Sequence, residues 1–144
     1  MKIIVLYGRG NTGKSTAIRR FFETYVNKNP LWSIEKSSIK TLDICIRAIY
    51  KNNIIGIISH GDTEACVMAG LEFVGDCDIL ICASRGKGAA MELIKSKSND
   101  IVWLEKDTCV VHGDIIKNGD VDWIREEQAN HTAARINGVL QMLI

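Results

Sequence analysis

Short, continuous runs of apolar residues alternate along the chain with segments of helical periodicity, and this alternation restricts the fold most. Such runs are typical of strands that are buried on both faces of a parallel sheet. The expected strands are Lys2–Tyr7, Ile54–Ser59, Asp78–Ala83 and Ile101–Glu105, and the expected helices are Gly13–Asn27, Asp62–Val74, Lys87–Lys97 and Val121–Leu143. Strands that alternate with helices predict an α/β fold, a three-layer sandwich with a mostly parallel sheet, in which residues 1–144 form a single domain.

The remaining segments have weaker signals. Asp43–Tyr50 is rich in β-branched and apolar residues and precedes the turn signal Asn52-Asn53, so we expect a hairpin with the strand at 54–59; the alternative is a helix over 43–50. Residues 31–41 are ambiguous and fit a short strand around Trp32–Ile34. Residues 106–119 are expected to be irregular or to contain a short strand.

Composition and charge narrow the class of protein. The chain has 144 residues, 47% hydrophobic and 24% charged, as is typical of a soluble globular protein. A formal net charge of +1 gives no evidence for nucleic acid as a partner. Its five cysteines have no repeated C-x-x-C spacing and are expected to be small buried residues. The N-terminal apolar run is too short for a signal peptide, and no stretch is long enough for a membrane span. We therefore expect a cytoplasmic protein in a reducing compartment.

A glycine-rich motif follows the first expected strand. The residues Gly8-Arg9-Gly10-Asn11-Thr12-Gly13-Lys14-Ser15 match the pattern G-x-x-x-x-G-K-[ST], and Thr16 follows directly. Glycines allow consecutive backbone N–H groups to converge on phosphate oxygens, and the helix that follows adds its free N-terminal donors. Lys14 would supply a positive charge near the β- and γ-phosphates, and the Ser15 hydroxyl would bind Mg²⁺.

With this motif between a buried strand and a helix, the chain resembles the P-loop NTPase superfamily. The resemblance in motif covers about residues 1–27, and the strand–helix alternation extends it loosely over the remainder. It implies a P-loop NTPase-like fold that binds a nucleoside triphosphate with Mg²⁺, with Gly8, Gly13, Lys14, Ser15 and Thr16 in the matching roles. It does not define the substrate.

An acidic residue after a neighbouring strand would complete such a site. Ile54–Ser59 is followed by His60-Gly61-Asp62, so Asp62 is the candidate for the outer shell of the metal or for orienting a nucleophile. Asp62 is equally well placed to cap the following helix, and both roles are compatible. Glu64, in the first turn of that helix, is a weaker candidate for the same role, and its expected interaction is with the helix dipole.

Basic and histidine residues are expected at the same sheet edge. Arg85 follows the strand Asp78–Ala83 and would stabilise charge on a transferred phosphoryl group. Lys87 is expected to be solvated, and His60 to be a loop histidine bonded to backbone, with proton relay as its alternative. Ordinary surface positions are expected for His112, Asp114 and His131.

Missing motifs restrict the reaction. The chain has neither an N-K-x-D nor a D-x-x-G motif, so ATP is favoured over GTP as the nucleotide. The leading hypothesis is Mg²⁺-dependent ATP binding with possible ATPase or phosphotransferase activity of kinase-like type, in which Lys14, Asp62 and Arg85 are the catalytic residues. One alternative is a non-catalytic nucleotide-sensing module that acts on a protein partner. The other is a kinase for a small metabolite or nucleoside, with its acceptor between residues 28–53 and the loop after Ala83.

Overall fold

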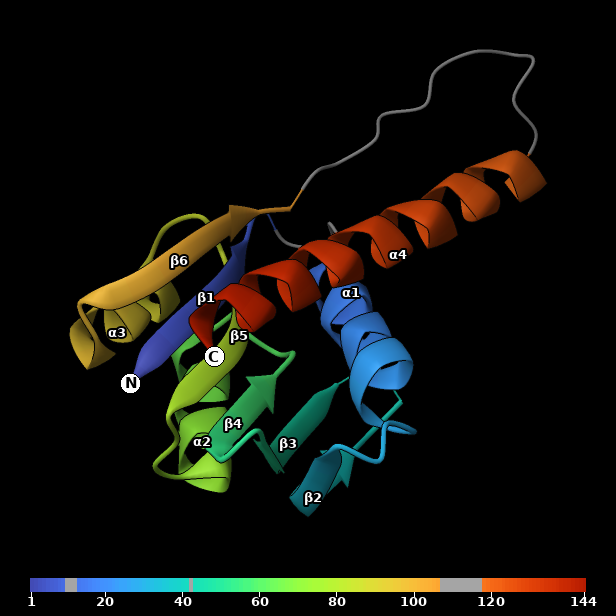
Figure 1. The fold of residues 1–144 in the computed structure, drawn as a ribbon. Coiled ribbons are helices and arrows are strands. Elements are labelled where there is room, and N and C mark those ends of the chain that lie inside the picture. Colours follow the sequence, from blue (N-terminus) through green and yellow to red (C-terminus); the bar gives the residue numbers. More distant parts are fainter. Residues whose placement is uncertain (10–12, 42, 107–117) are drawn as a thin grey trace.

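The computed structural model describes residues 1–9, 13–41, 43–106 and 118–144, with the backbone alone for residues 118–121. The candidate loop residues Gly10, Asn11 and Thr12, as well as His112 and Asp114, lie outside these ranges. Within them the chain forms a six-stranded sheet with helices on both faces (Figure 1). This confirms the predicted α/β class. In the described ranges, no helix combines the length and the apolar character that a membrane span requires.

The sheet combines parallel and antiparallel pairing. Its parallel part consists of β4 (Asn53–Ile58), β5 (Ile79–Ser84), β1 (Lys2–Tyr7) and β6 (Asp100–Glu105), in this spatial order. Beyond β4 the sheet continues with β3 (Ile44–Tyr50) and β2 (Trp32–Ile39), which are both paired antiparallel. The bounds of the four parallel strands agree with the prediction to within one residue, because these strands carry the continuous apolar runs.

The β3–β4 hairpin is confirmed, and the helical alternative over 43–50 is wrong. Lys51 and Asn52 form the turn with positive φ angles of 48° and 62°, the combination found in two-residue hairpin turns of type I′. Its neighbour β2 is eight residues long rather than a short strand around Trp32–Ile34. Most side chains of β2 are exposed, so the sequence has no alternating apolar pattern that would have marked its length.

Two hydrophobic cores separate the helices from the sheet. On one face, α1 (Lys14–Phe21), which continues as the π-helical turn η1 (Phe22–Val26), packs with α4 (Asn118–Leu143) against the sheet (Figure 1). On the other face lie α2 (Glu64–Val74) and α3 (Ala89–Lys97). One apolar side of α4 faces the first core, where Ala133, Ile136 and Leu140 are buried. The layering is therefore helix, sheet, helix.

One edge of the sheet collects the segments that the sequence analysis singled out. The carboxyl ends of β1, β4, β5 and β6 lie at this edge because the four strands are parallel. The start of β3 lies there too, since β3 runs antiparallel to β4. The chain leaves β1 toward the face covered by α1 and leaves the adjacent β5 toward the face covered by α3. Ligands of open α/β sheets bind where neighbouring connections diverge in this way.

Candidate functional site

Gly8, Arg9 and Gly13 are the described residues of the segment between β1 and α1. The Gly8 N–H donates to Ser84 O at 3.2 Å, which ties the segment to the end of β5. Gly13 precedes α1 with φ 86° and ψ 20°, a left-handed conformation that favours glycine. Of the described side chains, none caps the start of α1, and its first turn contains no acidic residue. The amino end of α1 therefore presents its positive dipole at the sheet edge without a carboxylate on its own first turn.

Lys14 is a buried cation inside this segment. Its side chain is only 5% exposed, and its Nζ donates to Gly8 O at 3.0 Å and to Arg9 O at 2.6 Å. Burial is the main reason why the pKa of Lys14 lies below its ordinary value of 10.5, and nearby Arg85 lowers it further, whereas Asp62 opposes the shift. The ammonium group thus has few water contacts and is held by carbonyl oxygens of the loop, which a phosphate could replace.

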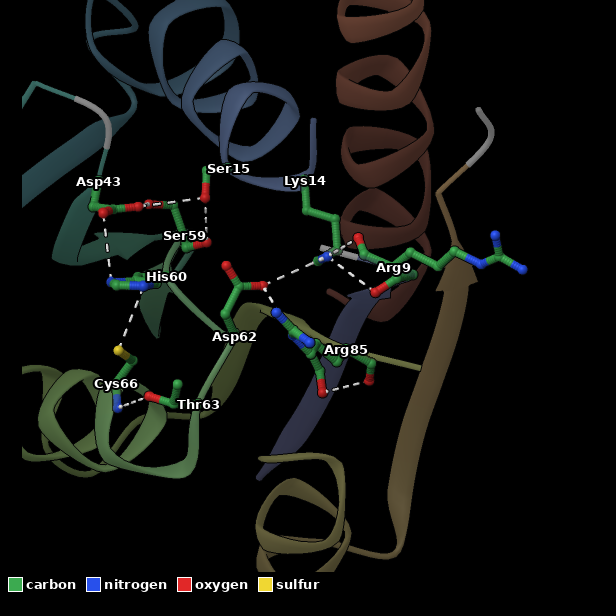
Figure 2. Close-up of polar contacts among 12 residues, drawn as sticks. Arg9, Lys14, Ser15, Asp43, Ser59, His60, Asp62, Thr63, Cys66 and Arg85 are labelled. Atoms are coloured by element: carbon green, nitrogen blue, oxygen red, sulfur yellow. Dashed lines mark hydrogen bonds and ion pairs between the residues drawn. The ribbon is translucent and has the colours of Figure 1, made fainter. Parts of the chain in front are cut away.

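Asp62 lies between two cations. Its Oδ1 is 3.8 Å from Lys14 Nζ and 3.9 Å from Arg85 Nε, as Figure 2 shows. The structure therefore brings together the three residues that the sequence analysis proposed as catalytic. Asp62 and Arg85 are 41% and 56% exposed, so both remain accessible to a ligand.

The capping role expected for Asp62 belongs to the next residue. Thr63 is the N-cap of α2, and its hydroxyl accepts a hydrogen bond from the Cys66 N–H at 3.2 Å. Both Asp and Thr are common caps, so residue type alone did not separate the two positions. The side chain of Asp62 is directed instead toward Lys14 and Arg85 (Figure 2).

This assignment predicts different outcomes for two neighbouring substitutions. We expect Thr63→Ala to lower the free energy of unfolding by about 1 kcal/mol, because the Cys66 N–H loses its acceptor. Asp62→Asn should lower it less, since Asp62 caps no helix, is itself 41% exposed, and lies 3.8 Å and 3.9 Å from its two cations, longer than a hydrogen bond. Urea denaturation of both variants measures the difference. A larger loss in Asp62→Asn than in Thr63→Ala would contradict the assignment.

Ser15 lies beside a carboxylate that the sequence analysis did not identify. The Ser15 hydroxyl is 3.0 Å from Ser59 O and 3.3 Å from Asp43 Oδ1. Asp43 Oδ1 also accepts from the buried Ser59 hydroxyl at 3.3 Å. In the sequence, Asp43 is marked only as the first residue of an expected strand. An antiparallel hairpin places that start beside Ser59, so the predicted pairing contained a signal for Asp43.

His60 makes side-chain contacts rather than the expected backbone bond. Its Nδ1 is 3.4 Å from Asp43 Oδ2, and its Nε2 is 3.4 Å from Cys66 Sγ (Figure 2). His60 comes from the loop after β4, whereas Cys66 lies in the first turn of α2. Asp43 therefore connects the Ser15 hydroxyl on one side with an imidazole and a thiol on the other.

A second buried cation at this edge was also missed. Lys106 follows β6, its N–H donates to Tyr7 O at 2.8 Å, and it is 6% exposed. A Cβ built on Gly13 would lie 3.7 Å from Lys106 Cε, so the lysine stem passes beside the turn into α1. Lys106 follows an expected strand, but no motif in the sequence distinguishes it.

The other candidates lie at the periphery. Arg9 and Thr16 are exposed, as are Lys87, Glu64 and His131. Among the residues that the structure describes, no group of three histidine, cysteine, aspartate or glutamate side chains could hold a metal ion by itself. Mg²⁺ usually keeps several waters and binds through one or two protein groups plus phosphates. Ser15 with its neighbour Asp43 provides a donor set of this kind.

Comparisons with known proteins yielded no relatives. No protein-family model matches the chain, and neither a curated protein nor a solved structure matches it.

Proposed function

We propose that this protein binds a nucleoside triphosphate, with ATP as the leading candidate, together with Mg²⁺ at the edge formed by the loops after β1, β4, β5 and β6. The observation that carries the proposal is the buried ammonium of Lys14, held inside a glycine turn at the amino end of α1. Burying a charge is costly unless it has a counter-charge; the partly exposed Asp62 provides one at 3.8 Å, and a phosphate chain would add a second.

The residues around Lys14 fit an anionic ligand. Arg85 and Lys106 add positive charge on two further sides of the segment, and the start of α1 adds its dipole. Asp62 holds Lys14 and Arg85 at one carboxylate, which aligns both cations before a ligand arrives. Phosphate oxygens would exchange with the Gly8 and Arg9 carbonyls as acceptors of the lysine.

The proposed metal binds through Ser15. A hydroxyl that coordinates Mg²⁺ through its oxygen needs an acceptor for its proton, and Asp43 Oδ1 and Ser59 O both lie within reach of it. When bound, the metal would offset the charge of the phosphates. In this arrangement Asp43 positions the serine, whereas Asp62, expected at the metal from the sequence, orders the cations.

The engaged carboxylates favour the nucleotide-sensing alternative as a second candidate. Asp62 already pairs with two cations, and Asp43 already contacts Ser15, Ser59 and His60. A carboxylate that orients an attacking water or hydroxyl must be able to accept its proton in reach of the γ-phosphate. Phosphate release measured under saturating ATP separates the candidates: turnover supports an ATPase, and tight binding without turnover supports a sensor.

Calorimetric titration with ATP and GTP, each with Mg²⁺ and with EDTA, tests the binding proposal directly. We expect saturable binding of ATP that is stronger with Mg²⁺. The absence of saturable heat and of any thermal shift for both nucleotides would overturn the proposal.

The role of Asp43 leads to a specific prediction about the metal. We expect Asp43→Asn to weaken ATP binding about tenfold in Mg²⁺, because the amide lacks the charge that orients the Ser15 hydroxyl toward it. In EDTA the variant and the original chain should bind ATP with similar affinity. Asp76→Asn, an exposed change of the same charge at the opposite edge of the sheet, is the matched control. Equal losses with and without Mg²⁺ would contradict the role.

A further inference from the structure

Cys66 and His60 have no part in the proposed nucleotide site, and they form an arrangement with the second carboxylate oxygen of Asp43. Cys66 Sγ lies 3.4 Å from His60 Nε2, and the other ring nitrogen of His60 lies 3.4 Å from Asp43 Oδ2. A nucleophile within reach of a base, which is in turn oriented by a third group, is the general design of an activated nucleophile. Figure 2 shows the imidazole between the thiol and the carboxylate.

We propose that Cys66 is a second reactive site of this protein, a thiol that hydroperoxides oxidise to sulfenic acid with His60 as the proton acceptor. The sulfur attacks one oxygen of the hydroperoxide, the S–O bond forms and the O–O bond breaks. The sulfur loses two electrons, and the thiol proton passes through His60 to the departing alkoxide or hydroxide. The products are Cys66 sulfenic acid and an alcohol, or water when the oxidant is hydrogen peroxide.

The position of Cys66 supports this chemistry. The residue lies in the first turn of α2, next to an imidazole and partly exposed, which are the surroundings of nucleophilic cysteines. His60 is 45% exposed, so a small oxidant can reach the pair from solvent. The same contacts require no nucleotide, and the inference therefore holds or fails independently of the proposed binding function.

Oxidation fits this site better than acyl transfer does. Acyl transfer needs N–H donors directed at the oxyanion that develops on the substrate. The backbone N–H of Cys66 itself already donates a hydrogen bond to Thr63 Oγ1, so it is not directed at a substrate oxyanion. A hydroperoxide develops its charge on the departing oxygen and needs only a proton, which His60 supplies.

The reactivity of the other cysteines of the chain can be compared with that of Cys66 in the same sample. Cys45 and Cys77 are also partly exposed, but burial raises the pKa of both thiols, and Asp43 raises that of Cys45 further. Cys82 is fully buried, which raises its pKa to about 12. These thiols should therefore react slowly at neutral pH. Cys109 lies outside the described residues and is distinguished by its own peptide.

The experiment is oxidation of the complete, nucleotide-free chain with hydrogen peroxide in the presence of dimedone, which traps sulfenic acid. Mass spectrometry of peptides then gives the labelling rate at each cysteine. We expect Cys66 to be labelled about tenfold faster than Cys45 or Cys77, or more. Labelling of Cys66 at the rate of Cys77 or below it would overturn the proposal, and this comparison needs no variant to fold.

Variants test the partners of the thiol. His60→Gln should slow Cys66 labelling about tenfold or more and leave Cys77 unchanged. Asp43→Asn should slow Cys66 labelling relative to Cys77, because the imidazole loses its orienting carboxylate. An unchanged Cys66 rate in His60→Gln would overturn the role of His60 as base. An unchanged ratio of Cys66 to Cys77 labelling in Asp43→Asn would overturn the positioning role of Asp43.

Discussion

Replacing Lys14 by methionine is expected to weaken binding of ATP with Mg²⁺ about 100-fold or more, equivalent to about 3 kcal/mol. Methionine keeps most of the aliphatic stem but lacks the ammonium group that Gly8 O and Arg9 O hold inside the turn. Buried charge-assisted hydrogen bonds are the strong ones, and a triphosphate would have no equivalent partner in the variant. Calorimetric titration measures the loss.

Lys97→Met is the matched control. It removes the same charge from an exposed position at the end of α3, near the opposite edge of the sheet from Lys14. The control should bind ATP as the original chain does, and both variants should melt near the original temperature. A similar loss of affinity in the two variants would mean that net charge, rather than the phosphate loop, attracts the nucleotide.

Because the pKa of Lys14 is lowered, the affinity for ATP should depend on pH. Because burial lowers this pKa below 10.5 in the free protein and a bound phosphate would raise it, binding takes up a proton between the two values. Affinity should therefore fall as pH rises through the pKa of the free protein toward 10.5. Lys14→Met should lose this dependence. Affinity that rises with pH over this range would contradict the assignment of Lys14 to the phosphates.

The sequence was sufficient to predict the parallel half of the fold. Strands β1, β4 and β5 lie inside the sheet and are largely buried, and their continuous apolar runs follow from this burial. Strand β6 is an edge strand of intermediate burial, but its run Ile101–Leu104 is equally apolar. Strand β2 was underestimated because it lies at the sheet edge with mostly exposed side chains. Its length results from pairing with β3, a tertiary contact that leaves no periodic pattern in its own residues.

The candidate site was also predicted only in part, because some of its residues are marked by a sequence pattern and others come together only through tertiary contacts. Lys14, Ser15, Asp62 and Arg85 were found because a motif or a strand end marks them, and the structure brings Lys14, Asp62 and Arg85 together. Asp43 depends on the register of β3 with β4. Lys106 and the His60–Cys66 pair depend on how separate loops approach one another. Distances between loops follow from the assembled sheet, and a pattern in one segment contains no information about them.

Gly61 connects the packing of the sheet to this site. A Cβ at Gly61 would lie 1.7 Å from Ala83 O and 2.3 Å from Ala83 C, both backbone atoms at the end of β5. The loop after β4 therefore passes directly against the neighbouring strand. This close approach lets Asp62 reach Lys14 and Arg85, which follow two other strands. No larger residue can occupy the position unless the two backbones separate.

We therefore expect Gly61→Ala to lower the free energy of unfolding by about 3 kcal/mol or more, at the upper end of overpacking effects, because backbone cannot move aside as a side chain can. Gly86→Ala is the control, since a Cβ there would meet only Tyr7 Cδ2 at 3.9 Å, an ordinary contact. Urea denaturation compares the two variants. If Gly61→Ala unfolds at the urea concentration of the original chain, the β4 loop does not press against β5, and the placement of Asp62 between its cations loses its structural basis.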